Sequence, residues 1–126
     1  MSSALRFALR SRLTTAMRER DRAAVSVLRT AVAAIENAEA VPMAEGAAVT
    51  TSADVAGAAV GLGVTEAERR RLDDAAERSL VVAEVHSLAE AEVAYAAAGQ
   101  PERAREAAVG AALLRAVLDE VGGLAR

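Results

Sequence analysis

Few side chains in this sequence have the chemistry of a metal or catalytic site. His86 is the single histidine, and Glu90 follows four residues later, which places both on one face of a helix. Such a pair supplies two metal ligands, but a closed site takes about four, and the chain has no cysteine to complete it. We therefore expect both residues to lie on a solvated helix surface, and we expect no metal and no cofactor.

Two groups of neighbouring carboxylates have the composition used in general acid–base catalysis. One consists of Glu36 and Glu39, and the other of Asp73, Asp74 and Glu77. Such catalysis requires a concave pocket that shifts the pKa of one carboxyl group, and no pattern in the sequence indicates such a pocket. The chain also lacks a GxSxG nucleophile elbow. A helical chain with one histidine and no cysteine is more typical of a binding or interaction module, so we expect no catalytic residues.

Basic charge is concentrated in the first quarter of the chain. Residues 1–30 carry seven arginines against two acidic residues, a balance of +5, whereas residues 31–126 carry a balance of −8. A basic segment beside an acidic body favours an electrostatic approach to phosphate groups. The side chains that would contact RNA phosphates are Arg10, Arg12, Arg18, Arg20, Arg22 and Arg29. The aromatic residues available to stack on bases are Phe7 and Tyr95.

The same arginines have a second interpretation, as partners in ion pairs between helices. They surround an apolar stripe rather than forming one patch, and the whole chain has a net charge of −3. Aromatic residues make up only 2% of the sequence. We favour the ion-pair interpretation for most of these arginines and keep RNA contact as the alternative.

The composition indicates which elements position these residues. The chain has 126 residues, enough for one domain, and 53% of them are hydrophobic, with no tryptophan. Sheets depend on aromatic and β-branched residues, so this composition favours closely packed helices. We predict an all-α compact bundle, a single domain of residues 1–126. Its predicted helices span residues 3–20, 22–40, 66–98 and 101–121, with a long loop at 41–64.

The lack of cysteine and of a long apolar N-terminal segment indicates the cellular compartment of the protein. The chain has no cysteine, which is typical of a reducing compartment. Arginines interrupt the apolar residues near the N-terminus, so we expect no secretory signal and no membrane span. We therefore expect a cytoplasmic protein.

Apolar residues recur at helical spacing along the first predicted helix, at Leu5, Leu9 and Leu13. Phe7 falls on the opposite face, and we expect it to dock under another segment. Asp21 is suited to cap the second helix, whose apolar residues step by three, four and three. Glu39 is the next position in that series. We favour its lying in water at the helix end; the alternative is burial beside an arginine, because an unpaired buried carboxylate is costly.

The second half of the chain contains clear helix boundaries. Thr65 and Glu68 form a capping box, which predicts a helix start at residue 66. Gly99 and Pro101 predict a helix end followed at once by a new helix. Gly122 and its glycine neighbour predict the end of the last helix. An antiparallel αα-hairpin across Gly99 follows from this order.

Two blocks of the sequence resemble the GatB/YqeY-like family. The first block consists of Leu13, Ala16-Met17, Arg20-Asp21, Ser26-Val27-Leu28-Arg29, Ala33-Ala34-Ile35 and Asn37-Ala38-Glu39. The second consists of Glu84-Val85, Tyr95, Gly99 and Glu102-Arg103-Ala104. The resemblance implies an all-helical fold. Longer members continue into a small C-terminal helical subdomain, and we expect this chain, which ends at Arg126, to lack it.

The resemblance also implies a function. The family is related to the tail of the GatB subunit of glutamine-dependent aminoacyl-tRNA amidotransferases, which implies a tRNA-associated role. Arg29, Asn37 and Glu39 lie where the family signature is densest and form the predicted polar functional cluster. We expect Glu84 and Tyr95 to lie near them if the hairpin packs there.

We therefore expect a non-catalytic module that binds tRNA or a tRNA-processing protein and does not enter a membrane. The predicted nucleic-acid-binding residues are Arg12, Arg18, Arg20, Arg22 and, in the cluster, Arg29. The first alternative is a protein–protein interaction bundle without an RNA role, in which the Ala/Leu seam of the last helix pairs with itself or a partner. The second alternative is an autonomous amidase or ligase.

Overall fold

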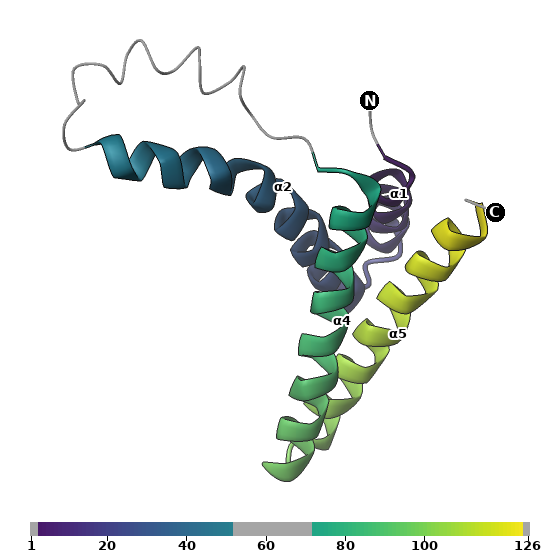
Figure 1. The fold of residues 1–126 in the computed structure, drawn as a ribbon. Helices are drawn as coiled ribbons and strands as arrows, with labels where there is room; N and C mark the ends of the chain where they lie inside the picture. The colour runs from purple at the N-terminus through teal and green to yellow at the C-terminus, as the bar shows by residue number, and fades with distance from the viewer. Residues whose placement is uncertain (1–2, 52–71, 125–126) are drawn as a thin grey trace.

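A computed structural model describes the backbone of residues 3–51 and 72–124. In these two ranges the chain forms four α helices and no strand, which confirms the predicted all-α class. The helices are α1 (Ala4–Arg18), α2 (Arg22–Thr51), α4 (Asp74–Ala97) and α5 (Pro101–Leu124). Figure 1 shows α4 and α5 as an antiparallel pair whose connecting turn lies far from α1, while α2 passes the pair and extends away from it.

The core lies where all four helices meet. Its largest fully buried side chains come from every helix: Leu9, Leu28, Ile35, Val81, Leu114 and Val117. The apolar stripes predicted for the first two helices and the last helix supply most of them, so the periodicity identified the buried faces correctly. Phe7 does not join the core, and its side chain is 70% exposed. The expected docking of Phe7 is therefore wrong, because the other helices pack only on the Leu5 and Leu9 side of α1.

Close approach of α5 to its neighbours depends on Gly110. A Cβ atom added there would lie 2.8 Å from Val27 Cγ2 on α2 and 3.4 Å from Leu88 Cδ1 on α4. The first distance is shorter than real Cβ contacts allow. Gly110 therefore sets how tightly three helices meet.

Side chains cap the starts of three helices. Ser3 Oγ accepts a hydrogen bond from the Arg6 N–H at 3.0 Å, and Asp73 Oδ1 accepts one from the Ala76 N–H at 2.8 Å. Asp21 caps α2 as predicted, with its Oδ1 atom 3.1 Å from the amide nitrogen of Ala24.

Several predicted boundaries differ from the structure. The loop expected from residue 41 is wrong for residues 41–51, because α2 continues to Thr51. The sequence around Pro42 is rich in alanine, and this helix propensity outweighs the proline. The third helix begins at Asp74 rather than residue 66, since Leu72 and Asp73 are not helical and Asp73 caps it. The last helix continues through Gly122 to Leu124.

The capping box at Thr65 and the loop prediction for residues 52–64 lie outside the described ranges.

The turn between α4 and α5 uses a glycine with a left-handed backbone. Gly99 has φ 75° and donates its N–H to the Ala96 carbonyl at 3.1 Å, while the Gln100 N–H donates to the Tyr95 carbonyl at 2.9 Å. These two hydrogen bonds form a Schellman motif. The predicted αα-hairpin across Gly99 is confirmed.

The turn between α1 and α2 has the same hydrogen bonds but no glycine. Arg20 donates to the Met17 carbonyl at 3.2 Å, and Asp21 donates to the Ala16 carbonyl at 2.9 Å. Arg20 has φ 58°, in the left-handed region that an arginine rarely adopts. The first helix therefore ends at Arg18, two residues before the predicted end at residue 20.

None of the helices in the described ranges combines the length and the apolar character needed to cross a membrane.

Candidate nucleic-acid interface

Three arginines gather around the turn between α1 and α2. Arg22 and Arg29 are seven residues apart on α2, which places them on one face two turns apart. The left-handed backbone at Arg20 brings a third arginine to the same place. The three residues line one hollow together with Met17, Val25, Ser26 and Thr30. We call this hollow the arginine pocket; none of its lining residues is acidic.

The arginines of residues 1–30 divide into two groups by their partners. Arg10 Nη2 lies 2.9 Å from Glu36 Oε2, and Arg12 Nη2 lies 3.2 Å from Glu120 Oε1. Arg6 is also paired, as described below. These pairs agree with the ion-pair interpretation of the basic segment. Arg12, one of the predicted nucleic-acid-binding residues, belongs to this group.

The arginines of the pocket form the second group. Within the described ranges, Arg20, Arg22 and Arg29 make no ion pair with an acidic side chain, and all three are exposed. Arg18 is exposed as well, but it does not line the pocket. The charge of the pocket is therefore available to an external anion.

A second hollow lies beside the arginine pocket, between α2 and the α4–α5 hairpin. Its aromatic member is the half-buried Tyr95, and the guanidinium carbon of Arg103 lies 5.9 Å from the centre of the Tyr95 ring. This distance is at the outer limit of a cation–π interaction, about 6 Å. The hollow, which we call the Tyr95 groove, is open to solvent and has a volume of about 530 Å³.

The arginine pocket and the Tyr95 groove are parts of one surface. Arg22 and Ser26 line both hollows, so the two meet across the first turns of α2. The groove also contains Glu106, one turn along α5 from Arg103, and apolar side chains such as those of Val27 and Leu88. The arginine pocket therefore holds three arginines and no carboxylate, whereas the groove holds two arginines and one carboxylate beside aromatic and apolar side chains.

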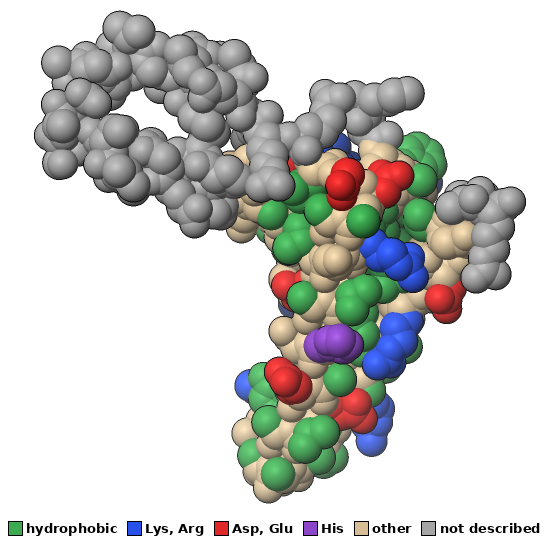
Figure 2. All heavy atoms as spheres, viewed as in Figure 1, with side chains coloured by type: hydrophobic (Ala, Val, Ile, Leu, Met, Phe, Trp, Pro, Cys, Tyr) green, Lys and Arg blue, Asp and Glu red, His purple; other side chains and the backbone are tan. Residues whose placement is uncertain are grey.

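Other parts of the surface carry mixed charge. A third hollow, between α1, α2 and α5, is lined by Arg12 but also by Glu19, Asp21 and Glu106, so it is unsuited to phosphate. Figure 2 shows the α4–α5 side, where basic side chains follow the hairpin with acidic side chains between and beside them. The arginine pocket differs from both regions because all of its charged side chains are basic.

The predicted polar cluster is not a single site. Arg29 and Tyr95 line neighbouring hollows, but Glu39 lies ten residues beyond Arg29 on α2, about 15 Å along the helix axis. Asn37 is exposed and Glu84 is half-buried, and neither lines the pocket or the groove. The cluster is therefore divided between the basic surface and the opposite part of the bundle.

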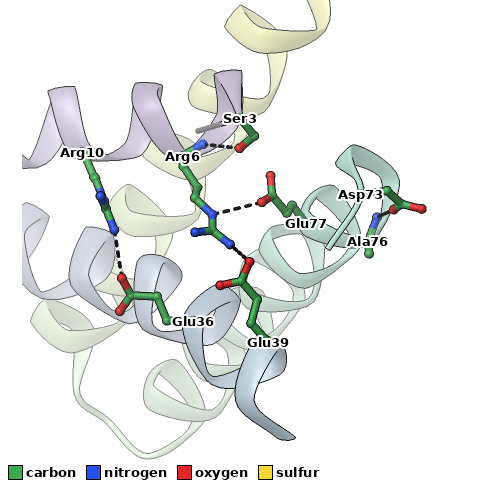
Figure 3. A network of polar contacts seen from close by, with 8 residues as sticks. All are labelled: Ser3, Arg6, Arg10, Glu36, Glu39, Asp73, Ala76 and Glu77. Carbon is green, nitrogen blue, oxygen red and sulfur yellow. Dashed lines mark hydrogen bonds and ion pairs between the residues drawn. The ribbon is translucent and has the colours of Figure 1, made fainter. Parts of the chain in front are cut away.

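Glu39 belongs to a buried charge network with Arg6 and Glu77, shown in Figure 3. Arg6 Nη2 donates to Glu39 Oε2, and Arg6 Nε donates to Glu77 Oε2 at 3.0 Å. The side chains of Glu39 and Glu77 are only 12% and 3% exposed. The favoured expectation that Glu39 lies in water is wrong, because α1 places Arg6 over it. The alternative, burial beside an arginine, is confirmed.

The network shifts the protonation equilibrium of Arg6. Burial lowers the pKa of Arg6, but hydrogen bonds and charge interactions with Glu39 and Glu77 outweigh burial and raise the pKa above its ordinary value. Glu77 Oε1 is buried without a hydrogen-bond partner in the described ranges. Sequence reasoning did not identify Arg6 or Glu77 as members, although a carboxylate on the α2 seam required a basic partner. The network joins α1, α2 and α4, and its burial makes it structural.

His86 and Glu90 are exposed on α4, as expected for a solvated helix surface. Among the residues that the structure describes, no three histidine, aspartate or glutamate side chains are grouped to hold a metal ion.

Comparison of the chain with protein-family models, curated proteins and solved structures found no match. The resemblance to the GatB/YqeY-like family therefore stays a prediction from the sequence. Function is inferred below from the arginine pocket and the Tyr95 groove.

Proposed function

We propose that this protein is a non-catalytic helical module that binds RNA through the arginine pocket. The observation that carries the proposal is the grouping of Arg20, Arg22 and Arg29 in one hollow that contains no acidic residue. Arginine presents several N–H donors in a planar fork that matches phosphate oxygens. Three such groups at one turn favour a polyanion over a single small anion.

The resemblance to the GatB/YqeY-like family supports tRNA as the RNA. In that reading the module works beside tRNA-dependent amidotransferase chemistry, a carbon–nitrogen ligase reaction with glutamine as amide donor, without performing it. Arg20, Ser26 and Arg29 stand both in the family-like block and in the arginine pocket. Two of the three pocket arginines therefore also carry the resemblance.

The α5 seam does not favour the alternative of a protein–protein interaction bundle. The seam residues Ala107, Ala111 and Leu114 are buried in the core of the chain itself. Among the residues whose side chains the structure describes, the exposed large hydrophobic residues are scattered over three helices, at Phe7, Met17, Val93 and Val109. Single exposed apolar residues are common on protein surfaces, so RNA binding is the better supported function.

Binding of fluorescently labelled tRNA, followed by anisotropy over a series of salt concentrations, tests the proposal. We expect the logarithm of the binding constant to fall linearly with the logarithm of salt concentration, by about 0.7–0.9 for each phosphate neutralised. A variant with Arg20, Arg22 and Arg29 changed to alanine should lower the slope by about 2.

Arg22→Ala removes one of these charges by itself, and its matched control is Arg115→Ala. Arg115 is exposed on α5 and lines neither hollow, so its loss removes the same charge from another place. We expect the control to bind tRNA like the unmodified chain. Absence of binding at low salt, or an equal slope in the triple variant, would overturn the proposal.

A further inference from the structure

We propose that the RNA bound by this surface is unpaired, with its phosphates in the arginine pocket and a base stacked in the Tyr95 groove. The inference rests on the proposed function and adds the class of RNA. It follows from three features of the surface: the distribution of charge, the position of Arg103 over the Tyr95 ring, and the backbone at Arg20.

Charge divides the surface into two parts with different ligand chemistry. The arginine pocket suits phosphates because it holds three arginines and no carboxylate. The Tyr95 groove holds two arginines, Arg22 and Arg103, with one carboxylate, Glu106, and it also holds apolar side chains such as those of Val27 and Leu88. A planar, uncharged base suits these aromatic and apolar side chains, whereas the charged side chains of the arginine pocket are all basic and suit phosphates. Arg22 lies at the junction, where a nucleotide would join its base to the chain of phosphates.

The groove has a stacking platform. The guanidinium group of Arg103 lies over the Tyr95 ring, 5.9 Å from its centre. Aromatic rings and arginine planes are the groups on which proteins stack unpaired bases. In a duplex the bases are already stacked on one another and paired, so they do not reach a side groove. The surface therefore favours single-stranded segments over double helices.

The backbone at Arg20 supports a role for its side chain. The two short turns of the fold share one hydrogen-bond pattern, and at the equivalent position the other turn has Gly99. Arg20 adopts φ 58° there, a conformation that glycine adopts without strain. Such strain is found where a side chain serves function. At this position the arginine adds a positive charge to the pocket, which a glycine would not supply.

The composition provides a direct probe of the groove. Tyr95 is the single tyrosine and the chain has no tryptophan, so intrinsic tyrosine fluorescence reports on this residue alone. We would titrate the full chain at low salt with single-stranded oligouridine of about 12 nucleotides, a length that suits one single-strand site. A duplex RNA of equal length is the comparison. We expect the single strand to quench Tyr95 emission and to bind at least ten-fold more tightly than the duplex.

Variants separate stacking from charge, with anisotropy of labelled RNA as the measurement. Tyr95→Leu should weaken single-strand binding about ten-fold, whereas Tyr95→Phe, which keeps the ring, should preserve it. Neither should change duplex binding. Arg20→Gly should weaken binding of both RNAs and reduce the salt slope. Circular dichroism verifies that each variant stays helical, and the quenching titration needs no variant at all.

The outcomes distinguish this inference from the proposed function. Salt-dependent tRNA binding without Tyr95 quenching, or equal affinity for single strand and duplex, would overturn the inference and leave the proposed function standing. Failure of every RNA to bind at low salt would overturn both.

Discussion

Arg6 Nε donates a hydrogen bond to Glu77 Oε2 at 3.0 Å, although the two residues are 71 positions apart in the sequence. Glu77 is a buried charged residue, 2% exposed, inside an otherwise apolar core. Because Arg6 also pairs with Glu39, one guanidinium fixes α1 against both α2 and α4. The position of α1 in turn determines where the α1–α2 turn holds the arginine pocket.

Replacing Arg6 should destabilise the fold strongly. Arg6→Met removes the positive charge while keeping much of the apolar contact, and it leaves the Glu77 carboxylate buried without its partner. Breaking a buried ion pair from one side costs about 3 kcal/mol or more. We expect the free energy of unfolding, measured by urea denaturation with circular dichroism, to fall by that amount at neutral pH.

The double variant Arg6→Met, Glu77→Leu is the matched control for that measurement. Removing both charges leaves no unpaired ion at Glu77, while Glu39 loses Arg6 in both variants, so the pair of changes should cost less than Arg6→Met alone. A double variant as unstable as the sum of the single variants would contradict the assignment of the cost to an unpaired Glu77.

The contribution of Arg6 should not depend on pH between about 8 and 10, above the range in which a carboxyl group left unpaired by Arg6→Met would titrate. Glu39 and Glu77 raise the pKa of Arg6 above its already high ordinary value. A group with a raised pKa stabilises the fold fully below its unfolded pKa, and this contribution is lost only as the pH rises through the folded pKa. Both values lie above the range measured. The difference in unfolding free energy between the unmodified chain and Arg6→Met should therefore stay constant, and a decline within the range would be inconsistent with the raised pKa.

Gly110→Ala should destabilise the bundle through contact with Val27. The added Cβ would lie 2.8 Å from Val27 Cγ2, so α5 or Val27 must shift, at a cost of about 1–3 kcal/mol. Val27→Ala removes the atom that the added Cβ would contact. In that background Gly110→Ala should be neutral or stabilising, because alanine has a higher helix propensity than glycine. Gly123→Ala, in the same helix with nothing within 4 Å, is the control and should not destabilise. Thermal unfolding of the set measures the coupling.

The helical class and the core faces followed from local periodicity, because burial along a helix repeats with the helical turn. The capping role of Asp21 and the hairpin at Gly99 also depend on residues close together in the sequence, and both predictions are confirmed. The continuation of α2 to Thr51 does not follow from local signals, because the proline, glycine and hydroxyl residues after Ala40 favour a loop. Helix propensity is summed over many residues, and alanine, the strongest helix former, is frequent on both sides of Pro42.

The three-dimensional arrangement of the helices was needed to distinguish the arginines that form ion pairs from those that line the pocket. Nothing local separates Arg12, paired with Glu120, from Arg22, which lines the pocket without an ion pair in the described ranges. The partner of Arg12 lies 108 positions away in the sequence. The seam position of Glu39 did signal that burial needed a basic partner, but it did not say which arginine. The pattern of one sequence can indicate that a buried charge needs a partner, but it does not identify the partner residue.

Arg20→Gly should make the protein more stable and a weaker RNA binder. The left-handed backbone at φ 58° costs an arginine about 1 kcal/mol relative to glycine. Part of this gain is lost because glycine makes the unfolded chain more flexible. We therefore expect the free energy of unfolding to rise by about 0.5 kcal/mol, while the salt slope of tRNA binding falls by about 0.7–0.9.

The reverse change at the other turn serves as the comparison. Gly99→Ala places a side chain at φ 75° with nothing within 4 Å, so its cost is backbone strain alone, about 1 kcal/mol. Gly99 lines neither hollow, and RNA affinity should be unchanged. If Arg20→Gly lowered stability, the Arg20 side chain would be holding the turn rather than serving the pocket. A rise in unfolding free energy together with a fall in RNA affinity in Arg20→Gly would show that the arginine serves binding at a cost to stability.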